Sequence, residues 1–146
     1  MADRMTAGFN IYGDSSDAWG MFMLEHDFPT PKEREILETV PYRSGSYDFS
    51  MLNGKPTYED REFTFVMLYD EADWQERSNY KAEVNQWLKG RMPSVMTTEL
   101  YENYEFNNVK CVDTQFENLG YGWKITLQFR AHPEVTNILT GERAVI

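Results

Sequence analysis

Two segments in which apolar and polar residues alternate strictly constrain the fold of this chain more than any other feature. Successive side chains of a β-strand point to opposite faces, so a period of two predicts a strand with at least one buried face. Residues 123–130 keep a polar second face, which indicates an antiparallel strand with one side open to solvent. Residues 61–69 become apolar on the second face at Val66 and Leu68, which indicates a central strand. The apolar sets are Phe63, Phe65, Met67 and Tyr69 in the first-numbered segment, and Trp123, Ile125, Leu127 and Phe129 in the other.

Weaker strand signals, bounded by turn residues, occur elsewhere in the chain. They lie at 9–12, 19–24, 32–40, 95–100 and 104–112, although the apolar residues of 32–40 also fit one face of a helix. The polar run 42–48 predicts a tight turn at Gly45, because glycine adopts positive φ without a Cβ penalty. Residues 1–133 are therefore expected to form a single β-rich domain, followed by a short C-terminal tail at 134–146 with no clear period.

One helix is predicted, at about 75–89. Apolar residues recur there at i, i+4, i+7 and i+8, which places them on one stripe that packs against the sheet. They are Tyr80, Val84, Trp87 and Leu88. Asp73 or Ser78 is the expected N-cap, and Gly90 is the expected residue just beyond the helix. Several short strands around one helix predict a mainly β (α+β) fold, an antiparallel β-sandwich or barrel with one packed α-helix.

Charge and composition exclude several classes of function. The 146-residue chain has 24 Asp and Glu residues against 14 Lys and Arg residues, a formal net charge of −10. This sign excludes binding of nucleic acid by charge, and it equally excludes electrostatic attraction to an anionic membrane. No apolar run approaches the roughly 20 residues that a membrane span needs, and a single cysteine, Cys111, cannot form an internal disulfide.

The sequence offers no arrangement typical of catalysis. There is no G-x-S-x-G motif, and neither His26 nor His132 has a promising nucleophile beside it. Cys111 lies on a predicted strand without a CxxC partner, so we interpret it as a small buried hydrophobe. The glycines of 120–122 indicate a hairpin turn rather than a nucleotide-binding loop. We therefore expect no catalytic residue, no metal ligand and no cofactor.

The segment VPYRSGSYDFS, residues 40–50, carries a more specific signal. It resembles the V-P-G-R-D-G-x-Y-D segment of the distal tail proteins of long-tailed phages (siphoviruses). Tyr42 stands in place of the first glycine of that family and Ser44 in place of its acidic residue. The matching residues, which the resemblance assigns to the motif turn of the family, are Pro41, Arg43, Gly45 and Asp48.

Further motifs of that family follow in the same order along the chain. Tyr58 and Arg61 precede the alternating strand, and the predicted helix ends in a W-L-x-G pattern at 87–90. A tyrosine-rich stretch lies at 101–104, and a closing strand of the W-x-I-x-L-x-F kind occupies 123–129. The resemblance therefore spans about residues 8–133. Family members usually carry a second β-rich domain after this one.

The resemblance implies a structural component of the virion tail rather than an enzyme. In that family the N-terminal domain builds a baseplate hub ring, so the implied assembly is a homohexamer that contacts the tail tube and tail-tip or receptor-binding proteins. The implied location is the tail of a phage or prophage particle, assembled in the cytoplasm of the bacterial host, with no cofactor. Six copies would carry a net charge of about −60, which repels phosphates in a channel through which DNA passes.

Tyrosine-rich segments leave an alternative open, a small carbohydrate-binding β-sandwich of an adhesion device in which aromatic rings stack on sugars. The candidate residues are Tyr47, Phe49 and Tyr58, or Tyr101 and Tyr104. The aromatic and methionine content fits equally a core together with a protein interface, where these residue types are enriched. The candidate oligomer interface is an apolar run near the N-terminus that contains Trp19, Met21, Phe22 and Met23.

Overall fold

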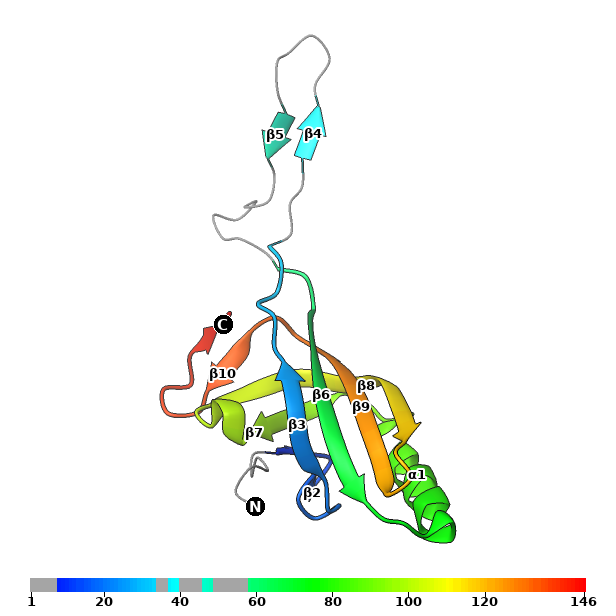
Figure 1. Cartoon of the computed structure of the whole chain (residues 1–146). Coiled ribbons are helices and arrows are strands. Elements are labelled where there is room, and N and C mark those ends of the chain that lie inside the picture. Colours follow the sequence, from blue (N-terminus) through cyan, green and yellow to red (C-terminus); the bar gives the residue numbers. More distant parts are fainter. Residues whose placement is uncertain (1–7, 34–36, 40–45, 49–57) are drawn as a thin grey trace.

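The computed structural model describes residues 8–33, 37–39, 46–48 and 58–146, and Figure 1 shows how their elements are arranged. One α-helix, α1 (Trp74–Leu88), and a 3-10 turn at Glu99–Tyr101 accompany the strands. All strand pairings within the described residues are antiparallel. The strands are β1 (Phe9–Ile11), β2 (Asp14–Ser15), β3 (Phe22–Asp27), β4 (Leu37–Thr39), β5 (Ser46–Asp48), β6 (Arg61–Asp70), β7 (Ser94–Thr98), β8 (Tyr104–Asn118), β9 (Gly122–Ala131), β10 (Val135–Asn137) and β11 (Arg143–Ala144).

The long strand β8 belongs to both layers of the fold. Its C-terminal half pairs with β9, and the sheet continues through β6 to the edge strand β3. Its N-terminal half pairs with β7 on one side, followed by β1 and β2, and with β10 on the other side. Between the halves, Asn108 has a positive φ of 55°, and the pairing register shifts between Cys111 and Asp113. Such irregularities bend a strand, and Figure 1 shows β8 passing behind the layer of β3, β6 and β9 towards β7.

Aromatic side chains fill the space between the layers. Phe9 of β1 stacks on Phe65 of β6 with ring centroids 4.8 Å apart, and it meets Phe129 of β9 edge-on at 5.5 Å. Phe63 of β6 packs on Phe106 of β8 at 5.3 Å. All five side chains are buried, so they contribute strongly to the hydrophobic stabilisation of the fold. The predicted fold class, an antiparallel β-sandwich with one packed helix, is confirmed.

The two alternating segments form the centre of the first layer. β6 and β9 pair along their whole length, from Arg61 opposite Ala131 to Asp70 opposite Gly122. The polar second face of β9 is half-buried along most of its length, whereas Leu68 on the second face of β6 is buried. The predictions of a one-sided strand at 123–130 and a central strand at 61–69 are confirmed.

The structure corrects several predicted boundaries. The strand predicted at 19–24 begins only at Phe22, because Trp19 and Gly20 belong to a turn in which their backbone N–H groups donate to the backbone oxygens of Ser16 and Asp17. Within 32–40, the structure places a strand at Leu37–Thr39. β8 continues beyond its predicted end to Asn118, because its outer half alternates only between half-buried and exposed positions and carries no clear apolar period.

The segment 134–146, expected as a tail, contributes two strands to the sandwich. β10 pairs with β8, with Val135 opposite Phe106, and β11 pairs with β10. Val135 is fully buried in the core. The sequence analysis missed both strands because elements of two or three residues are too short to show a period.

The helix α1 lies across the end of the first layer, where β6 ends and β9 begins (Figure 1). Its bounds differ by one residue from the predicted 75–89. Asp73 is the N-cap, and its carboxylate accepts a hydrogen bond from the backbone N–H of Glu76 at 3.2 Å. Ser78, the other N-cap candidate, lies inside the helix. Within the described residues, no helix has both the length and the apolar character required to traverse a lipid bilayer.

Candidate functional site

The predicted motif turn is described only in part. Pro41, Arg43 and Gly45 lie outside the described residues. Asp48 ends β5, where its backbone lies opposite Leu37 of β4. β4 and β5 form a two-stranded sheet of their own, which Figure 1 shows apart from the main sheet. Because an isolated pair of strands is at best marginally stable in water, this hairpin depends on further contacts for its stability.

The predicted stripe of α1 packs onto the sandwich. Trp87 lies nearly parallel to Phe9 and to Trp19, with ring centroids 5.7 and 5.0 Å away. Its Nε1 donates a hydrogen bond to the backbone oxygen of Ile11 at 3.2 Å. The helix is therefore attached to β1 by both ring stacking and a polar contact. The buried residues of the stripe are Tyr80, Val84, Trp87 and Leu88.

Tyr80 connects the helix to two other segments. Its ring stacks on that of Tyr69 with centroids 3.5 Å apart, and its hydroxyl donates to the backbone oxygen of Trp19 at 2.9 Å. Burial, followed by the charge of Tyr69, raises the pKa of Tyr80 well above its ordinary value. Tyr80 is therefore a neutral donor at physiological pH.

The predicted oligomer interface is divided between the core and the surface. Met21 and Met23 are only 2% and 1% exposed in a single chain, so they are core residues rather than interface residues. The alternation of the strand directs these two methionines inward and leaves Phe22 on the other face, half-buried. Trp19 is also half-buried against Trp87. Only Trp19 and Phe22 of the predicted set retain surface for a partner.

Carboxylates gather on the exposed side of the first half of α1. Burial raises the pKa of the Tyr69 hydroxyl, and the charges of Glu71, Glu76 and Glu83 raise it further. Glu76 and Glu83 are exposed and stand seven residues apart, on the same face of the helix, and Glu71 precedes its first turn. We call these three residues the α1 acidic surface.

Arg77 is a buried cation that the sequence analysis did not single out. It is 1% exposed, and its Nη1 donates to Oδ1 of Asn118 at 2.7 Å and to the backbone oxygen of Gly122 at 3.0 Å. Its guanidinium lies between two indole rings, 4.1 Å from the centroid of Trp74 and 5.4 Å from that of Trp123. Arg77 therefore joins the helix to the β8–β9 hairpin through hydrogen bonds and cation–π contacts.

Arg61, at the start of β6, is the second buried cation. Its Nη2 donates to the backbone oxygens of Pro133 at 2.9 Å and Ile146 at 3.2 Å, and its guanidinium lies 5.5 Å from the ring centroid of Phe106. Burial lowers the pKa of this guanidinium from its ordinary value. Arg61 thereby attaches the C-terminal segment to the sandwich, and the motif resemblance at this position was the only sequence signal for it.

The side chains with catalytic potential are dispersed. His26 is exposed on β3, whereas Nδ1 of His132 accepts a hydrogen bond from the backbone N–H of Glu134 at 3.3 Å. Cys111 is buried on β8, with its Sγ 3.4 Å from the backbone oxygen of Asp113. Among residues 8–33, 37–39, 46–48 and 58–146, no group of three or more His, Cys, Asp and Glu side chains is placed to hold a metal ion.

The thiol of Cys111 should be unreactive in the folded protein. Burial raises its pKa from 9.0 to about 11, so its thiolate fraction at pH 8 is about a hundredfold smaller than that of an unfolded chain. We expect alkylation by iodoacetamide at pH 8 to be correspondingly slower before denaturation than after it. Because the folded pKa is the higher one, the contribution of the thiol to stability is complete below pH 9.0 and is lost as the pH rises through about 11. Equal alkylation rates in the two states would contradict the buried placement.

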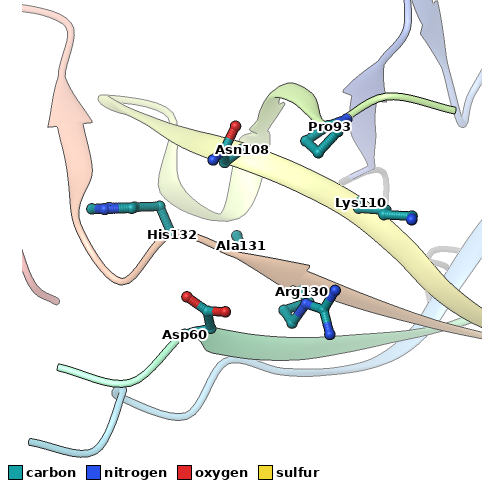
Figure 2. Close-up of a pocket in the computed structure, with 7 residues that line it drawn as sticks. All are labelled: Asp60, Pro93, Asn108, Lys110, Arg130, Ala131 and His132. Carbon is teal, nitrogen blue, oxygen red and sulfur yellow. The ribbon is translucent and has the colours of Figure 1, made fainter. Parts of the chain in front are cut away.

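A surface cavity of about 180 Å³ lies where β8, β9 and the start of β6 meet (Figure 2). Asn108 and Lys110 come from β8, and Arg130 comes from β9. Lys110 and Arg130 are direct cross-strand neighbours, so two cations stand side by side. The lining residues, which define what we call the β8–β9 pocket, are Asp60, Pro93, Asn108, Lys110, Arg130, Ala131 and His132.

The tyrosines proposed for sugar stacking do not form an open platform in the described part of the chain. Tyr101 meets Phe28 and Phe106 edge-on at 5.1 and 5.9 Å, and Tyr104 is also partly buried against the core. Tyr58 is half-buried, the side chain of Tyr47 is not described, and Phe49 lies outside the described residues. The most exposed aromatic side chains are instead Trp74 and Tyr121, which the sequence analysis did not propose.

The comparisons with known proteins identify the fold. No protein-family model matches this sequence, and no curated protein matches it significantly. Among solved structures, the chain is similar to the crystal structure of the Dit protein of phage SPP1, described as a paradigm of the hub adsorption apparatus in phages that infect Gram-positive bacteria. The two share 11% sequence identity with a TM-score of 0.74 over 91% of this chain, which spans about half (53%) of the Dit chain. The chain thus has the fold of one part of a phage hub protein.

Proposed function

We propose that this chain is a structural component of a long-tailed phage tail, in the hub that joins the tail tube to the tail tip. The observation that carries the proposal is the similarity of its fold to the Dit protein of phage SPP1, with a TM-score of 0.74 over 91% of the chain. At 11% identity this similarity concerns the fold, so the family motifs of the sequence add independent support. Those motifs occur in the family order from residue 40 to residue 129.

In this proposal the copies assemble into a hexameric ring in the virion tail, in contact with the tail tube and with tail-tip or receptor-binding proteins. Assembly takes place in the cytoplasm of the bacterial host. A ring requires a heterologous interface, in which one patch of each subunit meets a different patch of the next. The β4–β5 hairpin supports an assembly of this kind, because a two-stranded sheet outside the main sheet gains stability when another chain covers it. The proposed role requires no cofactor and no catalytic residue.

The charge of the chain supports a ring through which DNA passes. With a net charge of −10 per copy, six copies would carry about −60 and would repel the phosphates of a passing genome. A protein that held DNA would need the opposite sign. The charge also means that subunits repel one another unless their contacts are complementary, which the next subsection considers.

The experiment is a mass measurement in solution with negative-stain imaging of the purified chain. We expect a species of about 103 kDa, six copies of the 17.2 kDa chain, with a ring-shaped outline and an open centre. Phe22→Glu, at a half-buried position, should release monomers that remain folded. Met23→Glu, one residue further on and 1% exposed, should instead unfold the chain and serves as the matched core control.

A strictly monomeric protein across the high micromolar range, with no ring by imaging, would remove the support for a hexamer. The carbohydrate-binding alternative would then be tested by glycan-array binding. Loss of that binding on Tyr101→Ala or Tyr104→Ala would favour it over the ring.

A further inference from the structure

The β8–β9 pocket is unusual in a chain of this charge. Its lining includes two cations, Lys110 and Arg130, against one carboxylate, Asp60. Directly opposed like charges on neighbouring strands are unfavourable, so this cross-strand pair is costly unless an anion lies close to it. A site of this composition is therefore suited to a carboxylate.

The described part of the chain does not supply that carboxylate. Neither Lys110 nor Arg130 forms a salt bridge with any acidic residue that the structure describes. Asp60 lines the pocket without reaching either cation at salt-bridge distance. Glu62 lies opposite Arg130 across the β6–β9 pair, but its side chain lines a different hollow together with Glu59. The two cations therefore remain available to a partner.

The α1 acidic surface is complementary to the pocket and lies at the opposite end of the same strand. Arg130 is near the end of β9, whereas Gly122 begins it and pairs with Asp70, the residue just before Glu71. The strand rises about 3.3 Å per residue, so the two surfaces are about 26 Å apart. This distance is well beyond the Debye length of about 8–10 Å at physiological ionic strength. The two surfaces cannot neutralise one another within one chain, but they can do so between copies.

We infer that the β8–β9 pocket of one copy binds the α1 acidic surface of the next copy, head to tail. This inference rests on the proposed ring, and it names the contact that overcomes the repulsion between subunits of net charge −10. A head-to-tail contact between two different patches is the kind that closes into a ring. Charge complementarity of this type also selects the register and the correct partner.

The test is a charge exchange, read out by analytical ultracentrifugation and imaging. The first variant combines Lys110→Glu with Arg130→Glu, and the second combines Glu76→Lys with Glu83→Lys. We expect each to weaken self-association by roughly tenfold or more, because each places like charges across the contact. The chain that carries all four changes keeps a net charge of −10 and should recover association, because the complementarity is restored with its signs exchanged.

A matched control carries Lys89→Glu and Arg143→Glu, which change the net charge as the first variant does but at exposed positions outside the pocket. It should associate like the parent chain, and thermal melting should show that all the variants fold. Rings that are insensitive to the exchange, or a fourfold variant that fails to recover, would overturn this inference and leave the hexamer intact. A chain that is monomeric at every concentration would overturn both proposals.

Discussion

We expect Trp87→Ala to lower the free energy of unfolding by about 3–5 kcal/mol, the range observed when a buried tryptophan is truncated. Trp87 is 2% exposed, and its ring stacks between Phe9 of β1 and Trp19 of the N-terminal turn. Truncation leaves a cavity between the helix and the sandwich. It also leaves the backbone oxygen of Ile11 without the Nε1 donor, which adds to the loss. Urea denaturation followed by circular dichroism measures the change.

Trp74→Ala is the matched control, since it removes the same side chain from the same helix at a position that is 55% exposed. Its effect should stay within about 1 kcal/mol, because surface changes are usually small and only the contact with Arg77 is lost. A loss below about 1 kcal/mol for Trp87→Ala, no larger than that of an ordinary surface change, would contradict the packing of the helix stripe on the sandwich.

Gly122→Ala should be the second strongly destabilising change, with a loss of about 3 kcal/mol at the upper end of the usual overpacking range. A Cβ at this position would overlap the backbone oxygen of Tyr69 on the neighbouring strand β6. Backbone atoms cannot rotate away as a side chain can, so β6 and β9 would have to separate where they meet. The shift would also displace the backbone oxygen of Gly122 that accepts from Arg77. Thermal and urea unfolding measure the loss.

Gly120→Ala, in the same hairpin, separates steric overlap from backbone strain. Gly120 has a positive φ of 82° but open space around its Cβ position, so alanine there should cost only about 1 kcal/mol of left-handed strain. If the two alanine variants unfold at the same denaturant concentration, the close approach of Gly122 to Tyr69 is not limiting.

The parts of the fold that sequence analysis predicted are those with a long, regular period. β6 and β9 show strict alternation, and the stripe of α1 follows the helical repeat from Tyr80 to Leu88. At 21–24 every residue is apolar, so the sequence could not distinguish the core face, Met21 and Met23, from the outer face. Sequence analysis therefore assigned these methionines to an interface that the fold does not leave open.

The β8–β9 pocket could not be predicted, because its lining residues come from four separate segments. Lys110 lies opposite Arg130 only because the register of β8 shifts after Cys111, and such a shift leaves no signal in the sequence. Arg61 and Arg77 were missed for a related reason. An arginine usually marks the surface, and here hydrogen bonds to backbone oxygens and contacts with aromatic rings stabilise both residues inside the protein.

The shared strand β8 has a mechanical consequence. A continuous backbone passes from one layer to the other, so a load applied to the layer of β3, β6 and β9 reaches the layer of β7 and β1 through covalent bonds. Tension along β8 acts across the hydrogen bonds to β9 in shear, so many bonds resist together instead of opening one after another. The sandwich should therefore transmit force as one stiff body, with its weakest points at the short strands β2 and β11 on its margins.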